Sequence, residues 1–177
     1  MIINIQLPPA FKKFFYGLLT SLLLSTNVIA SSQYNGDDFS HWLDAAYIAD
    51  ASYKSRQDLE KVLVSQGYTL NQFKQLEGFS VGYALATNVD KRQHIIAVRG
   101  TSNVENVIVD AAFVLVPDKI TGVDIHQGFL LSARDIYQKI LPELSPGYTV
   151  NTIGHSLGGA AALIIAMMLD AQGHTCL

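Results

Sequence analysis

Apolar positions after residue 40 recur first at the spacing of helices. Ser40 is a suitable N-cap, and three apolar residues that follow it would share one face of a helix. They are Leu43, Ala46 and Tyr47. A sequence resembling a capping box begins at Ser55 and predicts a second helix, which Gly67 is well placed to end. The pattern therefore opens with two short helices.

The period then changes to that of strands. Alternating apolar residues predict a strand over residues 79–85, and a second strand is predicted over residues 94–98 after a polar turn. An amphipathic helix follows over residues 129–140, then a short strand over residues 148–153 and a nearly all-apolar helix over residues 160–171. Strands that alternate with helices predict an α/β fold with a mainly parallel sheet flanked by helices.

Residues 1–30 do not fit this pattern and are predicted to be a signal peptide. Two lysines precede an apolar stretch over residues 14–24, and Ala30 ends a run of residues suited to cleavage. A retained membrane anchor is the alternative, but a spanning helix needs about 20 mainly apolar residues and this segment is shorter. We therefore expect an exported protein, periplasmic or secreted, whose folded part comprises residues 31–177.

Composition narrows the class of protein. Of 177 residues, 49% are hydrophobic and 15% are charged, which suits a packed globular domain. The net charge is −3 with only 12 Lys and Arg residues, so nucleic acid is not an expected partner. The single cysteine, Cys176, excludes a disulfide within the chain and is either a free thiol or paired with sequence outside it. We predict neither a metal nor a cofactor.

The segment Gly154-His155-Ser156-Leu157-Gly158 fits the pattern G-x-S-x-G between a strand and a buried helix. Glycines on either side let the backbone turn sharply, so that the serine hydroxyl stands exposed above the sheet. The N–H of Leu157 then points toward a developing oxyanion, which the helix N-terminus also favours. The alternative is a glycine-rich turn with a bystander serine. The flanking strand and helix favour Ser156 as a catalytic nucleophile.

A second oxyanion donor is expected in the loop after an earlier strand. Arg99-Gly100-Thr101 ends such a strand, and Thr101 offers a backbone N–H and a hydroxyl. Taken alone, this tripeptide is better explained as a turn with a threonine N-cap.

Four segments, in order, resemble the class 3 (fungal-type) triacylglycerol lipase family. They are residues 94–101 (HIIAVRGT), 106–110 together with Phe113, 125–129 (IHQGF) and 152–161. The resemblance implies an α/β-hydrolase fold, incomplete at the C-terminus, and esterase or lipase activity through a Ser-Asp-His triad. It assigns Ser156 as the nucleophile, and Thr101 and Leu157 as the oxyanion donors. Residues 31–177 would then be the N-terminal part of such a domain.

The resemblance also implies that the segment from Ser102 to about Ile120 forms a lid that contacts a lipid interface. An apolar stripe at helical spacing agrees with this, although such a stripe more often marks a helix that faces the core. The stripe consists of Val104, Val107, Ile108, Ala111 and Leu115. Val107 departs from the family, which usually has Trp there. Asp110 matches a family aspartate and is expected to cap or hydrogen-bond within its own segment.

The acid and base of the triad are not found in this sequence. In the α/β-hydrolase order they follow the nucleophile. Asp170 lies within the last predicted helix, and His174 lies at its far end, more than about 20 Å from Ser156 at 1.5 Å per residue. His126 borders the lid segment and is expected to be structural. The remaining histidines are poorer candidates for the base: His41, His94 and His155.

The sequence therefore predicts a hydrolase that acts on carboxylic esters of lipids through an acyl-enzyme on Ser156. A lipid or a small ester is the expected partner. The alternative is a catalytically inactive remnant or a binding module, since the triad Asp and His are absent. A third interpretation keeps the elbow but changes the substrate to a thioester or a peptide. Acyl-chain preference, head group and oligomeric state stay open.

Overall fold

The computed structural model describes residues 36–75, 81–100 and 114–177. Contacts divide the chain into residues 1–40 and residues 41–177, and the fold below is that of the second unit. The expected signal peptide, Phe79 in the first predicted strand, and Thr101 lie outside the described residues, as does most of the expected lid. No helix within the described residues has the length and apolar character needed to cross a membrane.

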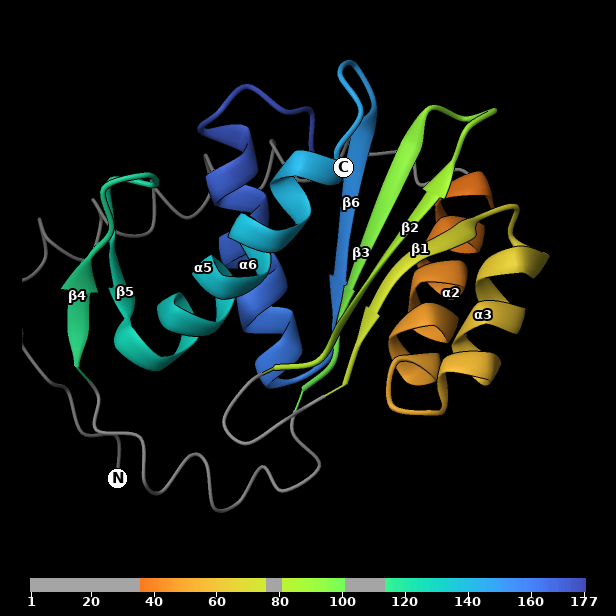
Figure 1. Ribbon diagram of the computed structural model, residues 1–177, viewed down its shortest axis with the longest axis horizontal. Helices are drawn as coiled ribbons and strands as arrows, with labels where there is room; N and C mark the ends of the chain where they lie inside the picture. Colours follow the sequence, from red (N-terminus) through yellow and green to blue (C-terminus); the bar gives the residue numbers. More distant parts are fainter. Residues whose placement is uncertain (1–35, 76–80, 101–113) are drawn as a thin grey trace, which may run out of the picture. The chain divides into compact units, whose positions relative to one another are not determined.

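Four strands form the main sheet, in the order β1-β2-β3-β6 (Figure 1). They are β1 (Thr69–Lys74), β2 (Tyr83–Asn88), β3 (Gln93–Val98) and β6 (Thr149–Gly154). β2 pairs antiparallel with β1 and with β3, whereas β6 pairs parallel with β3. The α/β class is confirmed, and the sheet of the described strands is mixed.

The expectation of a mainly parallel sheet is wrong for these strands. Only Val89 to Arg92 separate β2 from β3, and so short a connection permits an antiparallel hairpin alone. Parallel pairing needs a longer crossover, which the chain between β3 and β6 supplies. A second parallel contact begins at the other edge of β6, where Val150 forms an isolated bridge with Cys176.

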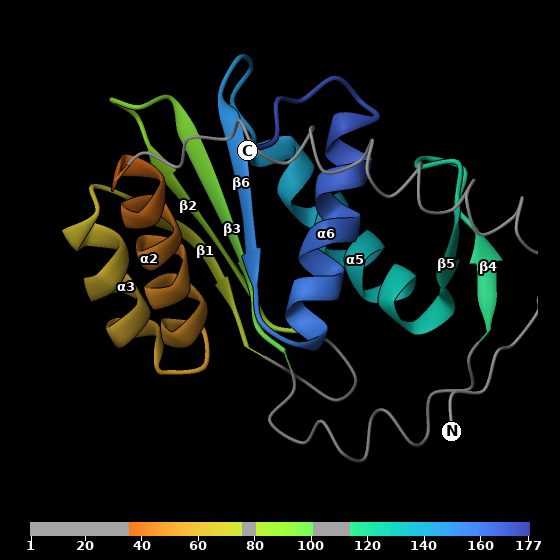
Figure 2. The same cartoon turned by 180° about the vertical axis from the view of Figure 1, so that it is seen from behind.

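Helices cover both faces of the sheet (Figures 1 and 2). On one face lie α2 (Gly36–Ala51) and α3 (Arg56–Ser65); on the other lie α5 (Gln127–Ile140) and α6 (Leu157–Asp170). Each face has its own apolar core. Ile48, Leu59 and Leu63 pack in the first core, while the second is larger and includes Ile136 and Ile165.

The face of α2 that packs on the sheet differs from the predicted one. Leu43 and Tyr47 are 44% and 56% exposed, and Ala46 is also exposed, whereas Ile48 is 1% exposed. The sheet beneath α2 carries small side chains, namely Ala84, Ala86 and Ala97. Because these sheet residues are small, α2 packs on them through the face that carries Ile48 and alanines. The bulkier Leu43 and Tyr47 remain exposed on its other face. The helix also begins before Ser40, so Ser40 is not its N-cap.

The other predicted elements are close to the observed ones. Ser55 is the N-cap of α3, and its hydroxyl accepts a hydrogen bond from the Asp58 N–H at 3.2 Å. The predicted helix over residues 129–140 corresponds to α5, which passes into the 3₁₀ helix η1 (Leu141–Glu143). The predicted strand over residues 148–153 corresponds to β6, and the last predicted helix corresponds to α6. These predictions are confirmed to within a few residues.

A two-stranded hairpin was not predicted. It consists of β4 (Leu115–Pro117) and β5 (Asp124–His126), paired antiparallel. Leu115 had been expected on the helical stripe of the lid and lies instead in β4, so its helical placement is wrong. Pro117 explains the difference, because it disfavours helical backbone at the preceding residue and has no N–H to continue a helix. β1 was also missed, since Leu70 is its one buried residue and gives no alternating apolar pattern.

Candidate active site

Ser156 lies at the turn between β6 and α6, with a backbone that L-residues rarely adopt. Its φ is 57° and its ψ is −129°, and it is one of two non-glycine residues with positive φ in the described part of the chain. Such geometry costs on the order of 1–3 kcal/mol and persists only where surrounding structure imposes it. The Ser156 side chain is exposed. The serine therefore sits at the apex of a strained strand-to-helix elbow, as the motif predicts.

Three glycines pack closely together at this elbow: Gly154 and Gly158 within it, and Gly100 in the loop after β3. A Cβ on Gly158 would lie 2.3 Å from the carbonyl oxygen of Val98 and 2.7 Å from the Gly100 nitrogen. A Cβ on Gly154 would lie 2.4 Å from the Gly158 carbonyl oxygen. These distances are shorter than any normal contact, so the backbones of the elbow and of the loop after β3 meet directly. The two outer glycines of the motif, Gly154 and Gly158, thus leave no room for a side chain.

The register of the parallel strands brings the loop after β3 to the elbow. Val98, the last residue of β3, pairs with Gly154, the last residue of β6, so both strands end side by side. Gly100 is then in contact range of Gly158, and the Arg99 N–H donates to the Gly82 carbonyl at 2.8 Å. Thr101 follows Gly100 directly in the sequence but lies outside the described residues.

The N-terminus of α6 presents backbone donors at the elbow. The N–H groups of Gly158 and Gly159 are engaged, donating to the carbonyl oxygens of His155 and Ser156 at 3.0 and 2.9 Å. Leu157, the first residue of α6, makes no backbone hydrogen bond through its N–H to any described residue outside that helix. A free N–H beside an exposed serine at a helix N-terminus can stabilise negative charge.

Tyr53 also contacts the elbow, a contact that sequence analysis did not predict. Its hydroxyl lies 3.2 Å from the carbonyl oxygen of His155 and 3.4 Å from Nδ1 of the same residue. The guanidinium carbon of Arg99 lies 5.6 Å from the centre of the Tyr53 ring. Tyr53 comes from the polar turn between α2 and α3, where no motif or spacing marks it as part of a site.

His94 is a structural residue. It is 1% exposed and lies between two partners: Thr87 Oγ1 is 2.9 Å from Nδ1, and the Ser145 N–H donates to Nε2 at 2.9 Å. A ring nitrogen that accepts from an N–H carries no proton, so the neutral tautomer has its proton on Nδ1 and donates it to Thr87. Burial and the charge of His174 lower the pKa of His94.

The contacts of His126 and His174 are with residues other than Ser156. His126 stands at the N-cap of α5 with its ring centre 4.6 Å from that of Phe129. His174 follows the end of α6, and its N–H donates to the Leu169 carbonyl at 3.0 Å. Among the described residues, no histidine or carboxylate is hydrogen-bonded to the Ser156 side chain.

Asp118 is the buried carboxylate of the described chain, and its oxygens are fully occupied. Oδ2 accepts from the N–H groups of Ile120 and Thr121 and from the Thr121 hydroxyl, while Oδ1 accepts from Arg134. Burial opposes its ionisation, but the hydrogen bonds from Thr121 and Arg134 outweigh burial and lower the pKa of Asp118. With both oxygens engaged, Asp118 holds the turn between β4 and β5 and is not available to a substrate.

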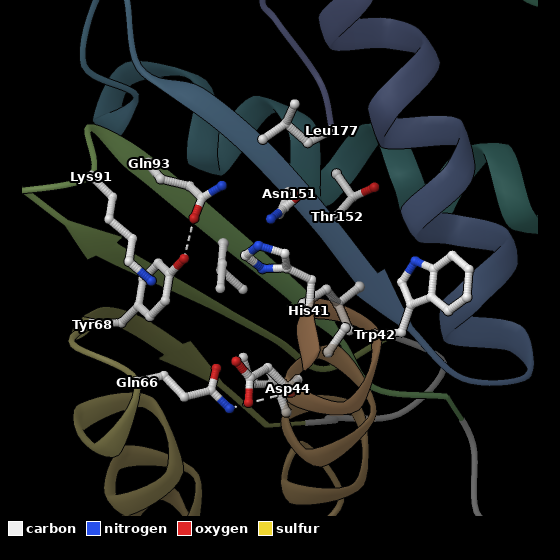
Figure 3. A pocket seen from close by; sticks show the side chains of 14 residues that line it. His41, Trp42, Asp44, Gln66, Tyr68, Lys91, Gln93, Asn151, Thr152 and Leu177 are labelled. Carbon is white, nitrogen blue, oxygen red and sulfur yellow. Dashed lines mark hydrogen bonds between the residues drawn. The ribbon is translucent and has the colours of Figure 1, made fainter. Parts of the chain in front are cut away.

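A cavity of about 410 Å³ lies on the face of the sheet that α2 covers (Figure 3). Side chains from α2, β3 and β6 line it, including His41, Trp42 and Asn151. The hydroxyl of Tyr68 donates to Gln93 at its edge. Ser156 and Leu157 are not among the lining residues. Within the described residues, no three His, Cys, Asp or Glu side chains are grouped as metal ligands.

A mixed α/β sheet whose parallel strand ends in a strained serine and continues into a buried helix defines the α/β-hydrolase class. Residues 95–175 match the family described as lipase (class 3). This stretch of the chain is therefore similar to the class 3 lipases. A solved structure of a nonglycosylated lipase from Yarrowia lipolytica is similar to this fold, with a TM-score of 0.68 and 25% identity. The alignment covers 81% of this chain and 58% of that one.

Curated relatives are similar over the same region. A lipase of Rhizopus niveus is 32% identical over 113 residues, which cover 60% of this chain and 29% of the relative. A secreted mono- and diacylglycerol lipase of Fusarium solani is 32% identical over 100 residues, covering 52% of this chain and 30% of the relative. This chain therefore spans less than a third of the length of these relatives.

Proposed function

We propose that this chain provides the nucleophile and oxyanion side of an active site that hydrolyses carboxylic esters of lipids. The backbone of Ser156 carries the proposal, since its φ of 57° is held by glycines that admit no other residue. A strained, exposed serine at a helix N-terminus is the arrangement that acyl transfer requires. The similarity to class 3 lipases supports a lipid ester as the substrate.

The reaction would proceed through an acyl-enzyme. The Ser156 oxygen attacks the ester carbonyl while a base removes its proton, and the carbonyl oxygen becomes an oxyanion. The Leu157 N–H and, by family resemblance, Thr101 would stabilise that oxyanion. The alcohol then leaves with a proton, and water releases the acid in a second step. The base and its acid partner follow the nucleophile along the chain in this fold.

A lid that contacts lipid remains part of the proposal. Its expected segment runs from Ser102 to about Ile120, and the structure describes only the end of it. There Val114 and Leu115 are exposed, and Val123 is exposed on the same hairpin. Exposed apolar side chains next to an active-site loop suit contact with a lipid surface. This contact would bring the elbow to its substrate.

Export is proposed with the function. The apolar segment over residues 14–24 suits a signal peptide that is cleaved near Ala30. The Fusarium solani relative is described as secreted, which agrees with this. Mass determination of the mature N-terminus from the culture medium and from the periplasm tests both the cleavage and the destination.

Replacement of the nucleophile tests the function. In the intact protein, Ser156→Ala should reduce hydrolysis of a p-nitrophenyl ester by about 10⁴-fold or more. Ser65→Ala is the matched control, because Ser65 is exposed and its hydroxyl donates only to the Val62 carbonyl of its own helix. Turnover by Ser156→Ala equal to that of the Ser65 control would overturn the proposal.

One observation favours a second candidate, a non-catalytic binding form of the 177-residue chain. Among the described residues no histidine or carboxylate is hydrogen-bonded to the Ser156 side chain, so none of these residues is seen in place to remove its proton. Labelling with a fluorophosphonate separates the candidates, since the probe reacts with an activated serine. Rapid labelling of this chain alone at Ser156 would exclude the non-catalytic form.

A further inference from the structure

We infer that Tyr53 is a positioning residue that fixes the loop after β3 against the nucleophile elbow. The inference rests on the proposed function for its catalytic consequence, while its structural part stands on contacts alone. Tyr53 is 102 positions from His155 in the sequence, yet its hydroxyl contacts both the backbone and the ring of that residue.

The Tyr53 hydroxyl makes one consistent pair of hydrogen bonds. It donates its single proton to the His155 carbonyl oxygen at 3.2 Å, since a carbonyl can only accept. The phenol oxygen then accepts from Nδ1–H of His155, at 3.4 Å. The edge of one ring meets the other ring, with centroids 6.1 Å apart at an interplanar angle of 68°. The tyrosine thereby selects the Nδ1–H tautomer of His155.

The same hydroxyl limits the approach of the loop after β3. A Cβ on Gly100 would lie 2.6 Å from the Tyr53 hydroxyl and 2.7 Å from the His155 carbonyl oxygen. Gly100, the hydroxyl and this carbonyl therefore meet at one point. Arg99, the residue before Gly100, places its guanidinium over the Tyr53 ring. Tyr53 thus contacts both segments that would supply oxyanion donors.

The held carbonyl belongs to the peptide unit that leads into Ser156. The His155 carbonyl accepts from the Gly158 N–H at 3.0 Å as well as from Tyr53. Two donors on one carbonyl fix the orientation of that peptide plane. The φ of Ser156 is measured from the carbonyl carbon of the same peptide, so this orientation helps to hold the strained backbone. Removal of the hydroxyl leaves the peptide with one donor, so the serine and the Leu157 N–H would lose part of their preorganisation. Small displacements of such groups reduce turnover strongly.

Tyr53→Phe in the intact protein tests this, because it removes the hydroxyl and keeps the ring beside Arg99. We expect kcat to fall about tenfold while KM changes less than about twofold. Tyr68→Phe is the matched control. It removes the tyrosine hydroxyl that donates to Gln93, at the opposite end of β3 from Gly100. The control should keep kcat within about twofold of the unmodified protein.

A measurement independent of activity separates this inference from the proposed function. Amide ¹H–¹⁵N shifts of Leu157, Gly158 and Gly100 should change in Tyr53→Phe and not in Tyr68→Phe. Unchanged shifts would overturn the inference, even if Ser156→Ala abolishes turnover. Changed shifts with kcat equal to that of the control would also overturn it, since Tyr53 would then be structural only. If Ser156→Ala leaves turnover intact, the proposed function fails while the shifts still report on Tyr53.

Discussion

Arg134 binds Asp118 through two nitrogen atoms of its guanidinium, with Nε at 3.1 Å and Nη2 at 2.5 Å from Oδ1. The Asp118 side chain is completely buried, whereas that of Arg134 is 38% exposed. Together with the three donors to Oδ2, this pair joins the β4–β5 turn to the middle of α5. Charge-assisted hydrogen bonds of this kind are stronger than neutral ones.

Asp118→Asn should destabilise the fold by about 2–4 kcal/mol, because it leaves a guanidinium and several N–H groups without a charged acceptor. Urea unfolding followed by circular dichroism measures the change. Asp135→Asn is the control, since the Lys139–Asp135 pair also spans 2.5 Å but is exposed. Surface pairs contribute about 0–1 kcal/mol. Equal losses in the two variants would contradict a structural role for the buried carboxylate.

Gly158→Ala should destabilise the protein by about 3 kcal/mol or more, because its Cβ would overlap the Val98 carbonyl oxygen at 2.3 Å. Gly122→Ala separates overlap from backbone strain. Gly122 has a φ of 75° and nothing within 4 Å of a new Cβ, so its loss should be about 1–2 kcal/mol. Thermal unfolding of both variants makes the comparison. A Gly158 variant as stable as the Gly122 variant would show that the elbow relaxes easily.

Acid should reduce stability through His94. Burial lowers the pKa of this histidine in the folded state, so the unfolded chain binds the proton first as the pH falls. The free energy of unfolding should therefore decrease below about pH 6.5, the usual pKa of histidine, and continue to fall toward the lowered value. Urea titrations at pH 8 and pH 5.5 measure the slope.

His94→Gln should reduce that slope, because it removes the group whose pKa burial lowers. Asp118 affects the free energy of unfolding in a separate, more acidic pH range. Hydrogen bonds lower its pKa in spite of burial, so its contribution is lost only as the pH falls below about 3.9, the usual carboxyl value. An unchanged slope in His94→Gln would assign the acid sensitivity to other groups.

The packing of α2 can be tested directly. Ile48→Ala should cost about 2–5 kcal/mol, because Ile48 is 1% exposed and packs in the core under α2. Leu43→Ala, on the face that the sequence pattern favoured, should cost less than about 1 kcal/mol, since Leu43 is exposed. The midpoints of urea unfolding compare the two. The reverse order would restore the face predicted from the sequence.

The sequence predicted the elements whose signals are local and strong. Ser55 and the apolar positions after it defined α3, and the G-x-S-x-G motif defined both the end of β6 and the start of α6. The face of α2 was not predictable, because its residues are apolar on two sides. Only the alanines of the sheet beneath it decide which side packs, and those lie more than 30 positions later.

In the candidate site, too, residues within a local motif were predictable, whereas residues that reach the site from a distant segment were not. Ser156 and Leu157 follow from five consecutive residues, and their geometry agrees with the motif. Tyr53 lies in a polar turn, and its contact with His155 exists only after α2 and β6 have been placed on the sheet. No sequence pattern around Tyr53 or around His155 predicts such a contact. Side chains that support a site from a distant segment are therefore the part of the site that sequence reasoning misses.

The parallel pairing of β3 with β6 sets the order in which this protein can fold. Gln93 and Thr149 are partners across 56 positions, whereas the β2–β3 hairpin closes over a four-residue turn. Closing a long loop costs more entropy, and nonlocal pairing slows folding, so the hairpin can form well before β6 docks. The strained backbone of Ser156 is thus acquired late, when β6 reaches β3. In a partly folded chain, Ser156 would have an ordinary backbone geometry. It would lack the strained conformation of a nucleophile until β6 pairs with β3.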